Sequence, residues 1–236
     1  MQVMLGTPVR SGFPTDYVKS LWSTRLRAST MWYPVSGLAV DVARNVIVEY
    51  FLKHSKSDYL VMHDSDATWH PDAIARLIAL DLPFVSAVIY QRAFPTVPFI
   101  GYVGEVRDNG ETVYSFQHAA GRVIDVALAN RYEPKEERAV LFDSDVVEEI
   151  DGCGAHFAVI RRDVLEAVEP PYYLVTHPPS GGEDFYFCRK VKEAGFGVYV
   201  NYAVHTGHIA GDGVTIGLRE FMLYSYRGKR RKRKEG

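Results

Sequence analysis

Residues 59–66 have the sequence Tyr59-Leu60-Val61-Met62-His63-Asp64-Ser65-Asp66, an apolar run that ends in two closely spaced carboxylates. The first four residues predict a buried strand, because consecutive large apolar side chains suit a strand that is covered on both faces. In an extended chain alternate side chains share a face, so Asp64 and Asp66 are expected to point the same way. Open α/β folds bind ligands at the carboxyl ends of strands, so this pair predicts a site for a hard divalent cation. The alternative is that the two aspartates cap a turn or the following helix.

The segments on either side of this strand indicate an α/β fold. Residues 38–53 carry apolar side chains at helical spacing, and Lys56-Ser57-Asp58 ends that predicted helix. Pro71 suits the first turn of a second helix, and a further strand is expected over residues 84–90. A strand–helix–strand unit favours parallel pairing of its two strands.

The rest of the chain predicts one domain with an insert. A first strand at residues 3–5 ends at Gly6-Thr7-Pro8. From about residue 95 to 149 short β-like runs surround Asp108-Asn109-Gly110, whose Asn-Gly pair predicts a hairpin. Periodicity then predicts two strands, over residues 155–160 and 198–200, and two helices, over residues 163–168 and 183–194. The predicted fold class is α/β: one domain over residues 1–226 with a mixed, mainly parallel sheet flanked by helices, a β-rich insert at 95–149, and a tail at 227–236.

The composition is that of an ordinary globular protein. The chain has 236 residues, of which 47% are hydrophobic and 24% charged, enough to bury the core of one α/β domain. Its two cysteines, Cys153 and Cys188, form no CxxC pair, which argues against a disulfide framework or a zinc site. The apolar start is too short for a signal peptide, and no stretch approaches a membrane span. We therefore expect a cytoplasmic protein without a transmembrane segment.

The net charge of −2 hides an asymmetry between the body and the tail. Residues 227–236 contain seven Lys and Arg side chains and one Glu, so residues 1–226 carry a net charge of about −8. Such a basic tail could contact an anionic partner, either nucleic acid or an anionic membrane surface. The interpretation that we favour is a solvated, disordered end that contributes to solubility.

Three further segments carry residues suited to chemistry. His205-Thr206-Gly207-His208, beyond the last predicted strand, could supply an imidazole to the same cation; mixed carboxylate and imidazole ligation suits Mn²⁺, with Mg²⁺ as the alternative. Glu183 and Asp184 follow a glycine loop at a helix start, where one of them could act as a general base or simply cap the helix. Gly152-Cys153-Gly154 allows the backbone to approach a ligand closely, although a plain turn explains it equally well.

Several common catalytic motifs are missing from the sequence. It contains no GxxxxGK[ST] phosphate loop, no GxGxxG after the first strand, no HExxH and no GxSxG. The usual ATPase, dinucleotide-binding, metalloprotease and serine-hydrolase interpretations therefore have no support.

In this order and spacing, the four segments resemble those of the GT-A glycosyltransferases, the fold of nucleotide-diphospho-sugar transferases, and especially their broad family-2-like group. The resemblance covers roughly residues 1–210 and is poor over the insert. The Asp-Ser-Asp-x-x-x-x-Pro-Asp-Ala run at 64–73 looks like the family's DxD strand end and the helix after it. Gly152-Cys153-Gly154 looks like its glycine turn, Glu183-Asp184 like its acidic pair at a helix start, and His208 like its late metal-binding histidine.

The resemblance implies a metal-dependent enzyme that moves a sugar from a nucleoside-diphosphate-sugar donor to an acceptor hydroxyl by an inverting displacement, with a retaining outcome as the alternative. Asp66 and His208 would bind the Mn²⁺ or Mg²⁺ ion, with His205 as the alternative histidine. Asp64 would bind the metal, directly or through water, or else the donor ribose. Asp184 would be the catalytic base of the transfer.

Further roles follow from the same resemblance. Glu183 would help Asp184 in catalysis by positioning the acceptor. The resemblance does not identify the acceptor molecule. Gln91 and Arg92, after the third strand, could contact donor or acceptor. The implied donor-binding residues lie at strand ends, in the glycine turn and on a helix: Thr7, Pro8, Arg44, Asp64, Ser65, Gly152 and Gly154.

Two rival interpretations remain at this point. Sugar nucleotidyltransferases use a related sheet, but residues 7–12 are a poor version of their glycine-rich, arginine-containing loop. The second rival interpretation is a non-catalytic protein of the same fold, or a nucleic-acid-binding protein that uses residues 227–234.

Overall fold

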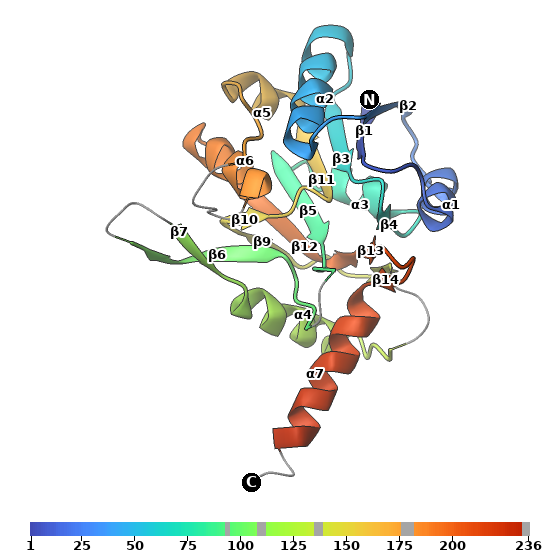
Figure 1. The fold of residues 1–236 in the computed structure, drawn as a ribbon, viewed down its shortest axis with the longest axis vertical. Helices are drawn as coiled ribbons and strands as arrows, with labels where there is room; N and C mark the ends of the chain where they lie inside the picture. Colours follow the sequence, from blue (N-terminus) through green and yellow to red (C-terminus); the bar gives the residue numbers. More distant parts are fainter. Residues whose placement is uncertain (93–94, 108–111, 135–138, 176–181, 233–236) are drawn as a thin grey trace.

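Eight strands form the central sheet of the molecule, shown in Figure 1. The computed structural model describes residues 1–92, 95–107, 112–134, 139–175 and 182–232. The strands of the sheet are β1 (Gln2–Val9), β2 (Ser29–Ser36), β3 (Tyr59–His63), β5 (Phe84–Val88), β8 (Val140–Leu141), β9 (Val147–Glu149), β11 (Phe157–Arg161) and β12 (Val198–His205). Their order is β2-β1-β3-β11-β5-β12-β8, with β9 also paired to β12.

The sheet is mixed and mainly parallel, as expected. β1 runs parallel to β2 and β3, and β12 runs parallel to β5. The expected direct pairing of β3 with β5 is wrong, because β11 lies between them and is antiparallel to both. Phe157 of β11 pairs with His63, and Ala158 pairs with Ser86. The backbone of β11 pairs with β3 on one side and with β5 on the other, and its residues from Phe157 to Ile160 are buried.

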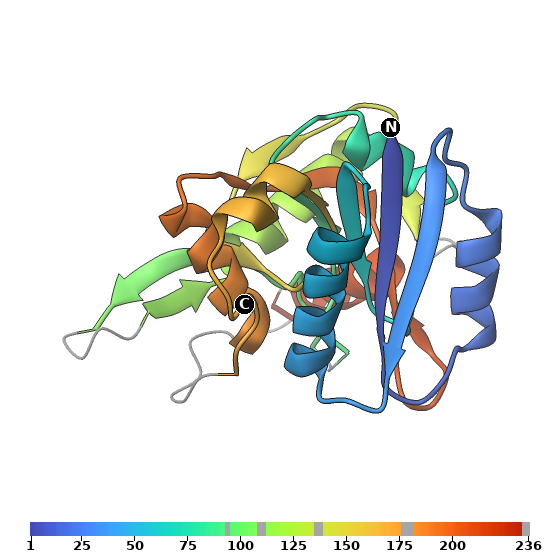
Figure 2. The ribbon, with the colours of Figure 1, turned by 90° about the horizontal axis from the view of Figure 1, so that it is seen from above.

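Helices cover both faces of this sheet. They are α1 (Thr15–Ser23), α2 (Val40–His54), α3 (Ala73–Ile78), α4 (Gln117–Ala129), α5 (Arg162–Ala167), α6 (Gly182–Glu193) and α7 (Leu218–Lys232). Figure 2 shows α1 and α2 on opposite sides of β1 and β2. Alternation along β1 separates two cores, since Met4 packs with α2, α5 and α6 while Val3 and Leu5 pack with α1 and α3.

Two small antiparallel sheets flank the central one. The first contains β6 (Ile100–Val106), β7 (Thr112–Ser115) and β10 (Gly152–Cys153). The second contains β4 (Ala67–Thr68), β13 (Gly207–Ile209) and β14 (Thr215–Ile216), with Ala67 opposite His208. This second sheet brings the residue after Asp66 next to the histidine of the late His-x-x-His segment.

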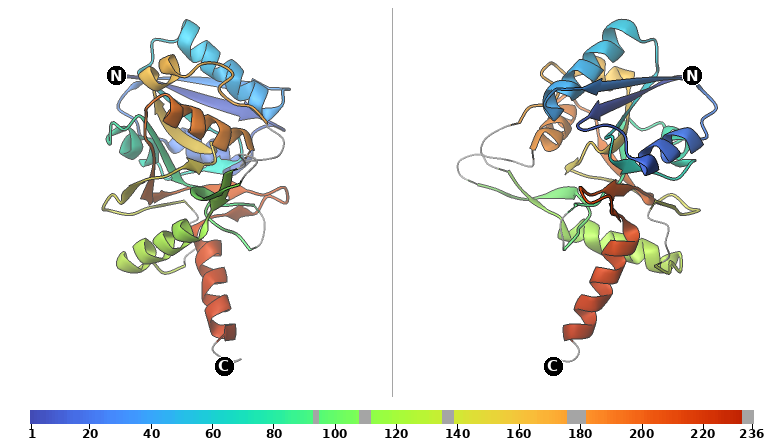
Figure 3. Two further views of the ribbon diagram at one scale, coloured as in Figure 1. Left: turned by 90° about the vertical axis from the view of Figure 1, so that its left-hand side faces the viewer. Right: turned by 45° about the vertical axis from the view of Figure 1, so that its right-hand side comes forward.

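The insert and the tail differ from the sequence-based expectation. Within 95–149 the structure contains the helix α4 besides strands, because apolar side chains at helical spacing, among them Val123 and Val126, are buried against the core. Residues 108–110, where a hairpin turn was expected, lie outside the described residues. α7 continues to Lys232, into the segment expected to be disordered, and projects away from the body in Figure 3.

Other boundaries also differ. β1 extends to Val9 and β12 to His205, so both strands are longer than their apolar runs predicted, while α1 and β2 were not predicted at all. Within the described ranges, no helix has the length and apolar character needed to cross a membrane.

Candidate functional site

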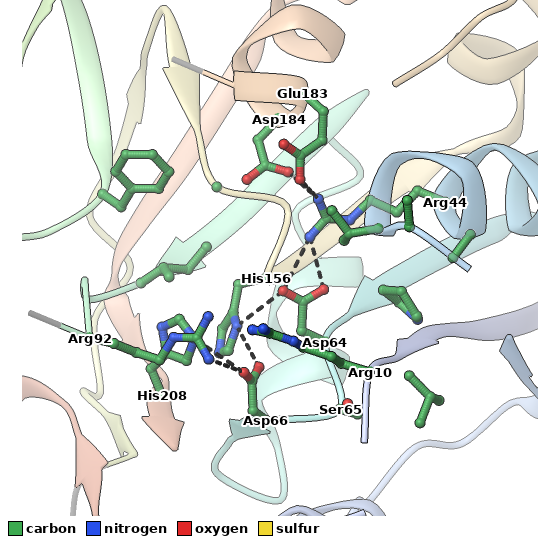
Figure 4. A pocket seen from close by; sticks show the side chains of 18 of the residues that line it. Arg10, Arg44, Asp64, Ser65, Asp66, Arg92, His156, Glu183, Asp184 and His208 are labelled. Atoms are coloured by element: carbon green, nitrogen blue, oxygen red, sulfur yellow. Dashed lines mark hydrogen bonds and ion pairs between the residues drawn. The ribbon is translucent and has the colours of Figure 1, made fainter. Parts of the chain in front are cut away.

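A cavity of about 690 Å³ opens at the carboxyl ends of β1, β3 and β5, beside the start of α6. Its lining includes four carboxylates, three arginines and two histidines, which Figure 4 labels: Asp64, Asp66, Glu183, Asp184, Arg10, Arg44, Arg92, His156 and His208. β11 is antiparallel, so residues just before its first strand position reach the same edge of the sheet. Residues from seven different elements or loops therefore converge on one cavity.

Asp66, His156 and His208 form the group that we call the Asp66 cluster. Their ligand atoms all lie within 4.8 Å of one another. The two oxygens of Asp66 face different rings: Oδ1 is 3.5 Å from His156 Nδ1, and Oδ2 is 3.5 Å from His208 Nε2. Arg92 Nη1 also donates to Asp66 Oδ2, at 2.8 Å. One carboxylate and two imidazoles thus surround a space of the size that a metal ion takes.

Backbone carbonyls orient both imidazoles toward Asp66. His208 Nδ1 lies 2.9 Å from the Tyr90 carbonyl oxygen, which can only accept, so Nδ1 carries the proton and the lone pair on Nε2 faces Asp66. His156 Nε2 lies 3.4 Å from the Gly207 carbonyl, which leaves Nδ1 facing the carboxylates in the same way. Carbonyl partners of this kind are typical of metal-binding histidines.

Two buried polar atoms of the Asp66 cluster lack a hydrogen-bond partner in the described part of the chain. They are Asp66 Oδ1 and His156 Nδ1. An unprotonated Nδ1 and a carboxylate oxygen at 3.5 Å repel each other, and either a proton on Nδ1 or a cation between the two atoms would remove that cost. The donor set of one carboxylate and two imidazoles fits Mn²⁺.

Electrostatics act differently on the three groups of this cluster. Burial, with His156 nearby, lowers the pKa of His208, which favours its neutral form. Burial alone would raise the pKa of Asp66, but the nearby His208 ring and the charge of His156 bring it below its usual value. Burial likewise opposes charge on His156, but the contacts of its Nδ1 with Asp64 and Asp66, each at 3.5 Å, raise its pKa. The two aspartates therefore favour a positive charge at this position, which a proton on Nδ1 or a metal ion would supply.

A second group, which we call the Arg44 cluster, contains Arg44, Asp64, Glu183 and Asp184. The Arg44 side chain, on α2, is only 2% exposed. Its Nη2 donates to both oxygens of Asp64, at 2.9 and 3.1 Å, and its Nη1 donates to Glu183 Oε1 at 2.6 Å and to Asp184 Oδ1. The Arg44 guanidinium and His156 hold the pKa of Asp64 well below its usual range, against the effect of burial. One buried guanidinium therefore holds three carboxylates in fixed positions.

Asp184 is the carboxylate of this cluster that is suited to proton transfer. Burial, together with the negative charges of Glu183 and Asp64, raises its pKa to about 7, although Arg44 and the Ala155 backbone N–H act in the opposite direction. A carboxylate whose pKa lies near neutrality is suited to accept and release a proton under physiological conditions.

The structure brings most of the predicted site residues to this cavity. Pro8, Ser65 and Gly154 line it, as do Gln91 and Arg92. The two aspartates of the Asp-Ser-Asp run converge on His156 Nδ1, each at 3.5 Å, but only Asp66 is in the close ligand group. The turn after β3 directs Asp64 to Arg44 instead, where both of its oxygens are bonded.

Thr7 is in a different place from the one expected. Because β1 continues to Val9, Thr7 is a buried strand residue and its side chain points away from the cavity. Its hydroxyl lies 3.1 Å from the Tyr17 hydroxyl and 3.3 Å from His63 Nε2, and it accepts a hydrogen bond from Trp32 Nε1 at 3.0 Å. The loop expected at Thr7 begins after Val9, so Arg10 reaches the cavity.

The two glycines of Gly152-Cys153-Gly154 have different surroundings. A Cβ atom at Gly152 would come within 2.3 Å of the Phe185 ring, so this glycine allows α6 to pack closely, and it does not line the cavity. A Cβ atom at Gly154 would lie 2.9 Å from Phe99 and 3.7 Å from Asp184 Oδ2. Gly154 therefore keeps the space beside the carboxylate of Asp184 open.

His205, the alternative histidine, lies outside the cavity lining. It is fully buried at the end of β12, with Nδ1 2.9 Å from the Tyr90 hydroxyl, and burial lowers its pKa to about 3. The candidate metal ligand that sequence reasoning missed is His156, a single histidine two residues after Gly154. Its one sequence signal is its position directly before a strand that follows a glycine turn.

Comparison with known proteins supports the fold. Neither a protein-family model nor a curated protein matches the sequence. The crystal structure of A197 from STIV is similar with a TM-score of 0.53 and 17% identity, over 92% of this chain and 93% of that one. The crystal structure of GalNAc-T7 with UDP, GalNAc and Mn²⁺ is similar with a TM-score of 0.54 and 11% identity, over 96% of this chain.

The chain spans about half, 47%, of the GalNAc-T7 chain. At these identities the similarity establishes the fold alone: the chain has a GT-A-like fold, as its motifs predicted.

Proposed function

We propose that this protein is a metal-dependent glycosyltransferase, which moves a sugar from a nucleoside-diphosphate-sugar donor to an acceptor hydroxyl. The observation that carries the proposal is the Asp66 cluster, with its two unpartnered buried atoms, in the same cavity as Asp184. The GT-A-like fold supports it, because open α/β folds bind ligands at the carboxyl ends of their strands, and the similar GalNAc-T7 structure contains UDP, GalNAc and Mn²⁺. A divalent cation bound by Asp66, His156 and His208 would neutralise the negative charge that develops on the leaving diphosphate.

Residues of the chain would accept the proton and position the reacting groups during the transfer. The acceptor oxygen forms a bond to the anomeric carbon, the bond from that carbon to the diphosphate breaks, and the nucleoside diphosphate leaves with the electron pair. The acceptor hydroxyl loses its proton during this attack, and Asp184 accepts it, which suits its pKa of about 7. Arg44 positions Asp184 and Glu183 by hydrogen bonds, which is the contribution of pre-organised geometry to the rate.

The test is a set of melting temperatures measured with UDP, GDP, CDP and dTDP, each with and without Mn²⁺. Binding to the native state raises the melting temperature by mass action, so one diphosphate should stabilise the protein only when Mn²⁺ is present. The shift should vanish in Asp66→Ala and weaken strongly in His208→Ala. Asp16→Ala removes an exposed carboxylate that pairs with Lys19, and should keep the full shift.

A second experiment tests catalysis by measuring the slow hydrolysis of the nucleotide sugar by water. Asp184→Asn should keep the metal-dependent shift and lose turnover. The absence of a shift with all four nucleotides would overturn the proposed function, and retained turnover in Asp184→Asn would remove Asp184 as the base.

A further inference from the structure

Arg92 shares an oxygen atom with the candidate metal site. Its Nη1 donates to Asp66 Oδ2 at 2.8 Å, and the same oxygen lies 3.5 Å from His208 Nε2. Figure 4 shows the Arg92 guanidinium beside Asp66 and His208. A cation held by Asp66 and His208 would need the position that this guanidinium lies against, and the two positive charges repel each other. Cation binding and the Arg92–Asp66 ion pair therefore oppose each other.

The other arginine of the site is fixed, whereas Arg92 can move. The Arg44 side chain is 2% exposed and bonded to three carboxylates. The Arg92 side chain is 44% exposed, and Asp66 is its one ion-pair partner within the described ranges. A long, half-exposed side chain can change rotamer without unpacking a core.

Once displaced from Asp66, Arg92 would lack a carboxylate to pair with in the cavity. The other three carboxylates of the lining, Asp64, Glu183 and Asp184, all pair with Arg44. An incoming ligand that carries its own negative charge would provide the missing partner. Guanidinium groups bind phosphate oxygens well, because their planar N–H groups match the geometry of two oxygens.

We infer that Arg92 exchanges between Asp66 and the diphosphate of the donor, so that the cation and the nucleotide bind cooperatively. This inference rests on the proposed function and identifies Arg92 as a positioning residue for the leaving group. With Asp66 as its partner, Arg92 lowers the affinity for the cation alone. With the diphosphate as its partner, it raises the affinity for the nucleotide. Linkage requires the two effects to appear together as one coupling between the ligands.

The experiment measures two affinities in wild type and in Arg92→Gln. Mn²⁺ affinity without nucleotide is followed by the electron paramagnetic resonance signal of free Mn²⁺. Affinity for UDP, GDP, CDP and dTDP at saturating Mn²⁺ is measured by calorimetry. In Arg92→Gln we expect Mn²⁺ alone to bind about 3- to 10-fold more tightly, because its competitor is gone. We expect the best nucleotide to bind about 10-fold more weakly, because a charge-assisted contact is lost.

Two other variants make the comparison specific. Arg10→Gln removes one positive charge from the same cavity, but Arg10 has no ion pair with Asp66, so Mn²⁺ affinity should change by no more than about twofold. Arg92→Lys keeps the charge next to Asp66 and should keep Mn²⁺ affinity near that of wild type.

The outcomes separate this inference from the proposed function. If wild type binds Mn²⁺ and a nucleotide, but Arg92→Gln binds Mn²⁺ no more tightly than wild type, the exchange of Arg92 is overturned while the proposed function stands. If Arg10→Gln and Arg92→Gln tighten Mn²⁺ binding equally, the effect is one of general charge and the exchange is also overturned. If wild type binds neither ligand, both proposals fail.

Discussion

The two clusters at the edge of the sheet contain similar side chains, but the charged groups of one have bonded partners and two buried polar atoms of the other have none. In the Arg44 cluster one buried guanidinium is bonded to three carboxylates. In the Asp66 cluster a carboxylate oxygen and an imidazole nitrogen face each other, buried, without a partner in the described part of the chain. Asp64 and Asp66 are two residues apart, yet each belongs to a different cluster.

This difference indicates that the Arg44 cluster holds the site together, whereas the Asp66 cluster binds a ligand. A completed ion cluster fixes the positions of its members, and its removal should cost stability. An incomplete set of donor atoms is a place for a ligand, and its removal should cost binding while stability changes little. The three predictions below test this division, from the largest expected effect to the smallest.

Arg44→Met should give the largest effect. It leaves three partly buried carboxylates close together without their cation, and we expect a loss of about 3–5 kcal/mol in the free energy of unfolding at pH 7. The measurement is urea denaturation followed by circular dichroism. The loss should shrink at pH 4, where the carboxylates of the variant can be protonated.

Arg76→Met is the matched control for that variant. Arg76 pairs with Asp145 near the surface, with both side chains about 30% exposed, and its loss should cost no more than about 1 kcal/mol. Equal losses in Arg44→Met and Arg76→Met would show that the Arg44 cluster has no special structural role.

Metal affinity should separate the two aspartates. Asp66→Asn removes a direct ligand, so Mn²⁺ affinity should fall more than about 100-fold, beyond what the loss of an outer partner costs. Asp64→Asn removes a nearby charge and a contact of His156, so we expect a loss of only about 10-fold. Equal losses in the two variants would return Asp64 to the role of a metal ligand and remove the division between the clusters.

The pH dependence of stability should give the smallest effect. The pKa of Asp184 is raised to about 7 in the folded protein, above the 3.8 of an unperturbed Asp. The folded state therefore holds this proton more tightly than the unfolded state, and the resulting stability is complete below about pH 4 and is lost as pH rises toward 7. Asp184→Asn cannot lose it, so the variant should gain about 1–2 kcal/mol relative to wild type between pH 5 and pH 7.5.

Urea denaturation of both proteins at several pH values measures this difference, and contributions from the histidines cancel because both proteins contain them. A difference between Asp184→Asn and wild type that stays constant with pH would mean that the Asp184 pKa is not raised.

The local sequence predicted the parts of the site that lie directly after regular elements. The apolar residues 59–62 placed the Asp-Ser-Asp run at a strand end, and the glycines at 181 and 182 placed Glu183 and Asp184 at a helix start. Both segments line the cavity, and so does His208. In each case a short-range pattern was sufficient, because the chemistry directly follows the element that positions it.

The parts that were missed depend on contacts between distant segments. His156 reaches Asp66 because β11 inserts antiparallel between β3 and β5, and spacing along the chain gives no sign of this. Likewise, the different roles of Asp64 and Asp66 depend on Arg44, a helix residue that packs across from the turn. α4 did have a helical pattern, which includes Val123 and Val126, but it lies within a segment whose neighbours are β-like.

The central claim is that one cation is held between Asp66, His156 and His208. The most direct measurement is a crystal structure of the protein with Mn²⁺ and the stabilising nucleoside diphosphate, with anomalous data collected at the manganese edge. We predict one strong anomalous peak in contact with Asp66 and both histidines. A peak among Asp64, Glu183 and Asp184, or no ordered peak in this cavity at saturating Mn²⁺, would contradict the account.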